Sequence, residues 1–201
     1  MPHTGVRRPG QLLMALFSEQ ADVSVRPAVP GDELAIAATQ LAAWRDAHSD
    51  MLGEEVLASL DGAAFAERWA VAITSPPSPG HRVLVACQGA DVVGFAAVGP
   101  LPSPHGSPLD PPGGEMLALE VAPRSQRAGH GSRLLAAAVD HLRQDGADHV
   151  QTWVLDGDSA RAQFLASAGL RADDAIRTLA SGTMADGTER RVTEHRWSAA
   201  I

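Results

Sequence analysis

The chain has 201 residues, the length of one domain with an extension. Its hydrophobic content of 45% is enough for an ordinary core, and its net charge of −8 argues against nucleic-acid binding through phosphate neutralisation, which needs a basic face. Cys87 is the only cysteine, which excludes an internal disulfide and a thiolate zinc site, and we expect it in the core.

Residues 1–21 are expected to form a loose N-terminal extension ahead of a single domain over 22–201. Arg7 and Arg8 precede a short apolar stretch, as in a signal peptide, but no small-residue cleavage site follows closely. No apolar run approaches the roughly 20 residues that cross a bilayer. We therefore expect a cytoplasmic protein with no membrane partner.

The first elements are expected to be a strand over 23–27 and two helices. Asp32 and Asp61 can each cap one of these helices. The apolar positions expected to share a face are Leu34, Ala37, Leu41 and Trp44 in the first helix and Phe65, Trp69 and Ile73 in the second.

A hairpin and a long loop come next. Apolar runs over 83–87 and 92–98 predict the hairpin, in which Gly94 indicates a bulge or a close contact. Residues 99–114 are rich in proline and glycine and predict a loop longer than most connections. A lid over a substrate and a disordered insertion are both open readings of this loop, and we favour the insertion.

The second half of the chain alternates strands and helices and ends in a hairpin. A strand–helix–strand order predicts a parallel pair at the centre of the sheet, and the hairpins on either side predict antiparallel edges. The expected elements are a strand over 115–121, a helix after Gly131, a strand over 149–155, a helix from Asp158 to Gly169, and strands over 172–181 and 189–198.

The turn between the strand over 115–121 and its helix carries the strongest functional signal. Gly129 and Gly131 lack a Cβ atom, so a ligand can approach the backbone closely. The first amides of a helix have no internal partner and carry partial positive charge, which suits a pyrophosphate. Arg127 and Arg133 can add charge, although a solvated surface explains them equally well. His130 is expected to be an exposed loop residue rather than a base.

Gln126-Arg-Ala-Gly129-His-Gly131 resembles motif A of the GCN5-related N-acetyltransferase (GNAT) family, Gln/Arg-x-x-Gly-x-Gly/Ala after a strand. A second local resemblance is the helix that starts at Asp158, where the family often carries asparagine, and ends before Gly169. With the element order, the resemblance covers about residues 22–198. It implies the α/β GNAT acyl-CoA N-acyltransferase fold, a mixed, mostly antiparallel sheet with one splayed parallel pair and flanking helices.

The resemblance also implies acetyl-CoA as co-substrate and direct acetyl transfer to a primary amine. In the family the pantetheine arm pairs with the motif strand, here Leu119, Glu120 and Val121, and the amide of Val121 would face the thioester oxygen. The pyrophosphate would lie on the motif turn. The cofactor-binding residues that follow are Leu119, Glu120, Val121, Gln126, Arg127, Ala128, Gly129, His130, Gly131, Ser132 and Asp158.

Glu115 stands where histone-type members of the family carry their general base, and Glu120 is the other candidate. An odd number of positions separates them in the strand, so we expect their side chains on opposite faces. Leu165 stands where the family has the tyrosine that protonates the leaving thiolate, and the chain has no tyrosine. A thiol has a pKa near 8.5, so a thiolate can leave without full protonation.

Two functions follow from these residues. The first is a small-molecule or protein N-acetyltransferase, and the alternative is a non-catalytic acyl-CoA-binding or interaction module, which Leu165 keeps open. No residue pattern in the sequence identifies the acceptor amine.

The eight histidines lack His-Glu-x-x-His spacing, so we expect no metal. The resemblance leaves a homodimer open.

Overall fold

The structure, a computed structural model, describes residues 23–102, 112–183 and 187–201. The predicted N-terminal extension and most of the predicted loop over 99–114 lie outside the described residues. The choice between a lid and an insertion therefore stays a prediction. The described part begins at the first predicted strand and ends with the predicted hairpin.

The centre of the fold is one seven-stranded sheet in the order β1-β2-β3-β4-β5-β7-β6. Among the strands that the structure describes, only β4 and β5 run parallel, and the other neighbours are antiparallel. The predicted fold class is confirmed, including the parallel pair. The strands are β1 Val23–Pro27, β2 Arg82–Gln88, β3 Asp91–Pro100, β4 Gly113–Val121, β5 His149–Leu155, β6 Arg171–Thr183 and β7 Glu189–Ala200.

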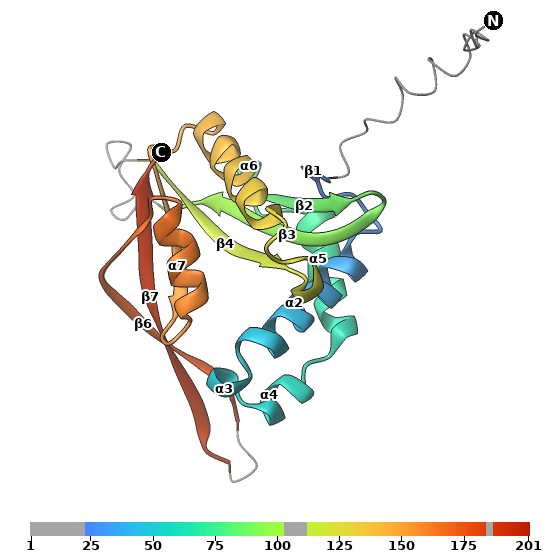
Figure 1. Cartoon of the computed structure of the whole chain (residues 1–201), viewed down its shortest axis with the longest axis vertical. Helices are drawn as coiled ribbons and strands as arrows, with labels where there is room; N and C mark the ends of the chain where they lie inside the picture. The colour runs from blue at the N-terminus through green and yellow to red at the C-terminus, as the bar shows by residue number, and fades with distance from the viewer. Residues whose placement is uncertain (1–22, 103–111, 184–186) are drawn as a thin grey trace, which may run out of the picture.

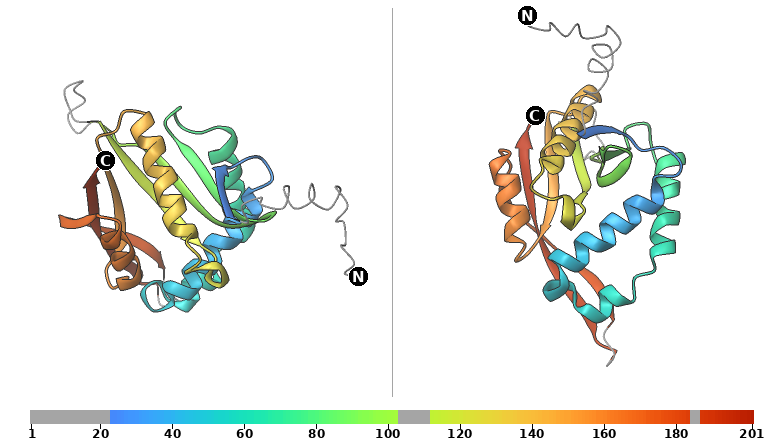
Figure 2. Two further views of the ribbon diagram at one scale, coloured as in Figure 1. Left: turned by 45° about the horizontal axis from the view of Figure 1, so that its top comes forward. Right: turned by 45° about the vertical axis from the view of Figure 1, so that its right-hand side comes forward.

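Helices cover both faces of this sheet (Figures 1 and 2). Alternate residues of β2 and β3 point to opposite faces, which gives two apolar clusters. One packs under α6 and α7, and the other packs under α2 and α5 and includes the buried Cys87, as expected. The helices are α2 Glu33–Ala47, α3 Ser49–Leu52, α4 Glu54–Ala58, α5 Gly62–Thr74, α6 His130–Gln144 and α7 Ser159–Ser167, with a 3₁₀ turn η1 at Pro123–Ser125.

The predicted face of α2 is partly wrong. Leu34 lies in the first turn and is 68% exposed, while the buried stripe also includes the polar residue Gln40. The stripe is wider than predicted because α2 packs against both the sheet and α5, and Trp69 of α5 donates its Nε1–H to Gln40 Oε1 at 2.8 Å.

The structure confirms one of the two predicted helix caps, Asp61, but not the other, Asp32. Asp61 accepts a hydrogen bond from the amide of Ala63 at 2.8 Å and caps α5 as predicted. Asp32 stands at the start of α2, but its carboxylate binds the guanidinium of Arg26 at 2.7 and 2.9 Å and the amide of Val29 instead. This carboxylate therefore ties the end of β1 to α2.

A bulge in β4 sets the direction of the strand's last residues. Ala97 of β3 pairs with Ala118 and Val98 pairs with Met116, so Leu117 has no partner on β3. Cross-strand partners share a face, and Glu115 and Glu120 pair with Gly99 and Phe95. These two glutamates therefore lie on the same face. The prediction of opposite faces is wrong, because the extra residue reverses the alternation.

Gly94 of β3 makes the predicted close contact. A Cβ atom there would lie 2.9 Å from the carbonyl oxygen of Glu120 and 3.2 Å from a methyl group of Leu134. Glycine at this position therefore lets α6 pack closely on the sheet beside β4.

Among the helices that the structure describes, none combines the length and the hydropathy needed to span a bilayer.

Candidate active site

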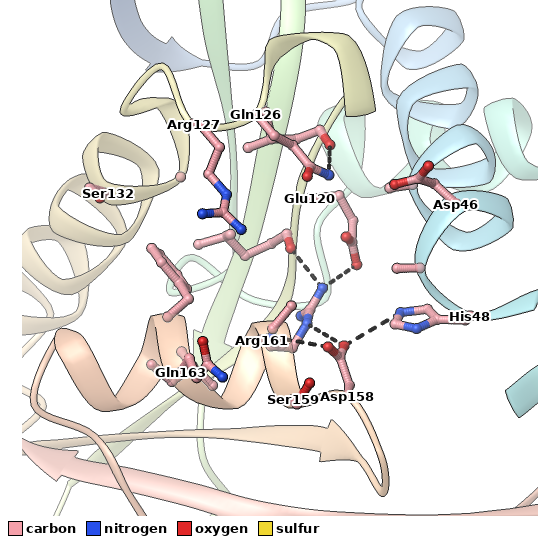
Figure 3. Close-up of a pocket in the computed structure, with 18 of the residues that line it drawn as sticks. Asp46, His48, Glu120, Gln126, Arg127, Ser132, Asp158, Ser159, Arg161 and Gln163 are labelled. Carbon is pink, nitrogen blue, oxygen red and sulfur yellow. Dashed lines mark hydrogen bonds and ion pairs between the residues drawn. The ribbon is translucent and has the colours of Figure 1, made fainter. Parts of the chain in front are cut away.

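The parallel strands β4 and β5 separate halfway along the sheet. They pair only where residues 113–115 lie beside residues 149–151, and the hydroxyl of Thr152 then donates to the carbonyl of Met116 at 2.9 Å. Beyond this point a cavity of about 820 Å³ opens between the strands. It is lined by the ends of α2 and β4, the turn before α6, and α7 (Figure 3).

The backbone of β4 faces this gap. The amide of Ala122 donates to Val93 of β3, and successive peptide groups of a strand point to opposite sides, so those of Leu119 and Val121 point away from β3. Side chains confirm this direction. Arg161 donates to the carbonyl of Leu119 at 3.0 Å, and Gln126 donates to that of Val121 at 3.3 Å.

The turn before α6 presents backbone donors to the same cavity. Gly129 has a φ of 81°, and Arg127 also adopts a positive φ, 62°, which folds the chain back sharply before the helix begins at His130. Gly131 lines the cavity, and a Cβ atom there would make ordinary contacts with Phe164 at 3.6 Å and Val121 at 3.9 Å. The amides at the start of α6 have no partner inside the helix, so the helix dipole and these donors favour an anion.

Most predicted cofactor-binding residues meet at this cavity. Two of them, Ala128 and His130, are not among the residues that line it, and neither is Glu115, the predicted base. Those that do line it are Leu119, Glu120, Val121, Gln126, Arg127, Gly129, Gly131, Ser132 and Asp158.

His130 differs from its prediction as an exposed loop residue. It is the first residue of α6 and is only 1% exposed. Burial, with a smaller contribution from the charge of Arg133, lowers the pKa of its imidazole, and neither ring nitrogen has a hydrogen-bond partner among the described residues. The sequence does contain a signal for the burial of His130. The apolar face of α6 extends one turn back to this residue, because a spacing of four residues joins His130, Leu134, Ala138 and Leu142.

The two candidate bases lie in different surroundings. Glu115 is partly buried on β4 and lines neither this cavity nor the second one described below. Glu120 lines both, and its Oε1 accepts a hydrogen bond from Nη2 of Arg161 at 2.6 Å (Figure 3). The side chains of Glu120 and Arg161 are 12% and 20% exposed, so this ion pair is largely shielded from solvent.

Asp158 organises the opposite wall. It caps α7 by accepting the amide of Arg161 at 2.9 Å, and its Oδ2 lies 3.6 Å from Arg161 Nε and 3.8 Å from Nε2 of His48. The imidazole of His48 is buried, and its Nδ1 has no partner among the described residues. Sequence reasoning missed His48 and Arg161, because neither belongs to a recognisable motif.

A second cavity, of about 340 Å³, adjoins the first. It shares His48, Glu120, Asp158 and Arg161 with the first cavity and extends between α2–α4 and the β6–β7 hairpin. Arg190 of β7 donates to the carbonyls of Met51 and Asp50, each at 3.1 Å, and holds the hairpin against α3.

Within the described ranges, no group of three or more His, Cys, Asp or Glu side chains is placed to hold a metal ion.

Comparison with known proteins gives this arrangement a family. The profile of the Acetyltransferase (GNAT) family matches residues 41–170, which include β4, the turn, α6 and α7. The chain belongs to the GNAT family. The resemblance seen in the sequence is thereby confirmed, as is the predicted class of enzyme, an N-acetyltransferase.

Individual GNAT proteins are similar over most of the chain. YuaI of Bacillus subtilis strain 168, named an uncharacterized N-acetyltransferase, is 30% identical over 134 residues, 67% of this chain and 72% of that protein. PaiA N-acetyltransferase of Thermoplasma acidophilum, solved with coenzyme A, has a TM-score of 0.69 at 16% identity, covering 89% of this chain and 99% of that one.

YncA of Salmonella typhimurium, solved with its cofactor acetyl-CoA, has a TM-score of 0.58 at 17% identity, covering 89% of this chain and 94% of that one. At these identities the two solved structures show the fold alone. Leu165, the residue predicted to stand at the position of the family tyrosine, is 1% exposed.

Proposed function

We propose that this GNAT protein is an acetyl-CoA-dependent N-acetyltransferase that transfers the acetyl group directly to a primary amine. The observation that carries the proposal is the turn at residues 127–132, which opens α6 and contributes Arg127, Gly129, Gly131 and Ser132 to the lining of a cavity between two diverging strands. A diphosphate with a long polar arm fits this combination, because the amides suit the anion and the exposed strand backbone suits an amide-containing arm. A cytoplasmic location belongs to the same proposal.

The residues of the turn and of β4 would hold the co-substrate. The amides from Arg127 to Ser132 would bind the diphosphate, and Leu119 and Val121 would pair with the pantetheine arm. The carbonyl of Leu119 already accepts a hydrogen bond from Arg161, so the arm must share or displace that contact. The amide of Val121 would stabilise the negative charge that develops on the thioester oxygen, and one such donor is typically worth about 3–4 kcal/mol.

When bound, acetyl-CoA supplies an acyl group whose carbon–sulfur bond breaks as the carbon–nitrogen bond to the amine forms. The attacking nitrogen must be unprotonated, and its proton passes to a base. We assign this base to Glu120, with a water molecule where needed, because Glu120 borders both cavities while Glu115 borders neither. Arg161 supplies a positive charge one helical turn before Leu165, where a departing thiolate needs stabilisation.

A non-catalytic acyl-CoA-binding module is the second candidate, and the buried Leu165 is the observation that favours it. The two candidates separate when the protein is incubated with acetyl-CoA and a panel of amines while free thiol is followed. We expect thiol release that depends on the amine and is matched by N-acetylated product. A rise in melting temperature with acetyl-CoA, without thiol release for any amine, would instead establish the binding module.

A further inference from the structure

We infer that the second cavity receives the acceptor, and that it selects a primary amine carried on an apolar body of about the size of a phenylalkyl group. This inference rests on the proposed function, and it adds the chemical class of the substrate. Four features of the cavity support it, namely its position, its apolar walls, its neutralised charges and its fixed shape.

The position of the cavity places an acceptor next to the proposed acyl site. His48, Glu120, Asp158 and Arg161 line both cavities, so they form the boundary between them. An amine nitrogen at this boundary would lie beside Glu120 with the rest of the molecule in the second cavity. The imidazole of His48 also stands at this boundary, with its Nε2 3.8 Å from Oδ2 of Asp158.

The walls of the cavity are mainly apolar and include two tryptophans. Trp44 of α2 and Trp153 of β5 line it together with leucine, valine and alanine side chains of α3, α4, β4, β6 and β7. Two of its leucines remain accessible to solvent, since Leu117 is 55% and Leu179 is 41% exposed. Leu117 is the bulge residue of β4, and bulges redirect side chains. Exposed apolar side chains that line one concave surface favour an apolar ligand.

The charged groups that line the cavity are paired. Glu120 binds Arg161 at 2.6 Å, and Glu194 binds Arg177 at 2.5 Å. Asp158 is used by the cap of α7 and lies near His48 and Arg161. A second ammonium group or a carboxylate on the acceptor would therefore find no unpaired opposite charge among the described lining residues. Polyamines and amino acids fit this chemistry poorly.

The shape of the cavity is fixed by contacts between elements far apart in the chain. Arg190 joins β7 to the carbonyls of Met51 and Asp50, and Gly182 of β6 lies so close to Val56 of α4 that a Cβ atom would approach its side chain to 2.9 Å. The volume of about 340 Å³ lies at the small end of ligand pockets, which suits one ring and a short chain.

The test compares 2-phenylethylamine with ethanolamine and putrescine as acceptors, using thiol release and identification of the acetylated product. We expect kcat/KM for 2-phenylethylamine to exceed that for either polar amine by about tenfold or more, the range that a few buried methylene groups provide. A preference for a polar amine, a polyamine or a polar peptide N-terminus would overturn the inference and leave the proposed function in place. Bound acetyl-CoA without transfer to any amine would overturn the proposed function and the inference together.

Matched variants test whether the second cavity produces this substrate preference. Leu117→Thr and Leu179→Thr should each lower kcat/KM for 2-phenylethylamine about tenfold and leave the KM for acetyl-CoA unchanged. Ile176→Thr is the control, since Ile176 is on the same strand as Leu179, is 59% exposed and does not line the cavity. All three side chains are accessible to solvent, so the variants should fold, which melting curves check. An equal loss in Ile176→Thr, or no loss in the two cavity variants, would contradict the inference.

Discussion

Arg161 of α7 places its Nη2 2.6 Å from Oε1 of Glu120 on β4, and the same nitrogen lies 3.0 Å from the carbonyl oxygen of Leu119. One guanidinium therefore joins α7 to β4 at the place where β4 has lost its hydrogen bonds to β5. Because it also lies between the two cavities, it can affect both the stability of the split sheet and the chemistry at Glu120.

The first prediction concerns the strength of this pair. We expect a double-mutant cycle of Glu120→Gln and Arg161→Met, measured by urea unfolding, to give a coupling of about 1–2 kcal/mol, because both side chains are largely shielded but not fully buried. The control pair is Arg143–Asp140 on α6, whose side chains are 54% and 65% exposed. Its coupling should not exceed about 0.5 kcal/mol. Equal coupling in the two cycles would show that the shielding of the Arg161–Glu120 pair has no energetic effect.

The second prediction separates the two candidate bases. Glu120→Gln should lower kcat by about 10²–10⁴-fold, while the affinity for acetyl-CoA stays within a few fold. Glu115→Gln should leave kcat nearly unchanged, since Glu115 lines neither cavity.

The loss in Glu120→Gln could also come from the broken pair with Arg161, so Glu120→Asp serves as the control. Aspartate keeps the carboxylate but changes its reach, and we expect its loss of kcat to be smaller than that in Glu120→Gln. A large loss of kcat in Glu115→Gln, with Glu120→Gln unaffected, would return the role of base to Glu115.

The third prediction concerns His130 and pH. Burial lowers the pKa of His130 in the folded protein, so the unfolded chain, with an ordinary histidine pKa near 6.5, binds the proton more readily. The contribution of His130 to stability is therefore complete above about pH 6.5 and declines as the pH falls toward the folded-state pKa. Each pKa unit of difference corresponds to about 1.4 kcal/mol.

Melting temperatures between about pH 7.5 and pH 5 measure this effect. His130→Leu should flatten the acidic decline relative to the original protein, because leucine fills the buried position without a titrating group. His141→Leu on the same helix is the control, since His141 is less completely buried. An acidic decline of the same steepness in His130→Leu would show that other groups cause it.

Local patterns in the sequence predicted the elements and the anion-binding turn, because both depend on residues close together in the chain. Glycines at positions 129 and 131 after an apolar strand are enough to indicate a turn with accessible amides. The position of β4 beside β5 followed from the strand–helix–strand order, since such crossovers produce parallel neighbours.

The features that sequence reasoning missed depend on register and on distant partners. The bulge at Leu117 arises from the pairing of β3 with β4, and it reverses the face that Glu120 would otherwise occupy. Arg161 meets Glu120 across 41 positions of sequence, and no local pattern specifies that contact. The burial of His130 follows from how α6 packs on the sheet, although its spacing from Leu134 gave a usable hint.

Acetyl-CoA binding at the start of α6 is the central claim, and calorimetry on two variants of Gly131 tests it most directly. Alanine at this position makes only ordinary contacts with Phe164 and Val121, and a glutamate side chain is favourable at the positive end of the helix dipole, so both variants should fold. We predict that Gly131→Ala binds acetyl-CoA within a few fold of the original protein, while Gly131→Glu loses binding by about 100-fold or more through repulsion of the diphosphate. Undiminished binding in Gly131→Glu would contradict the account.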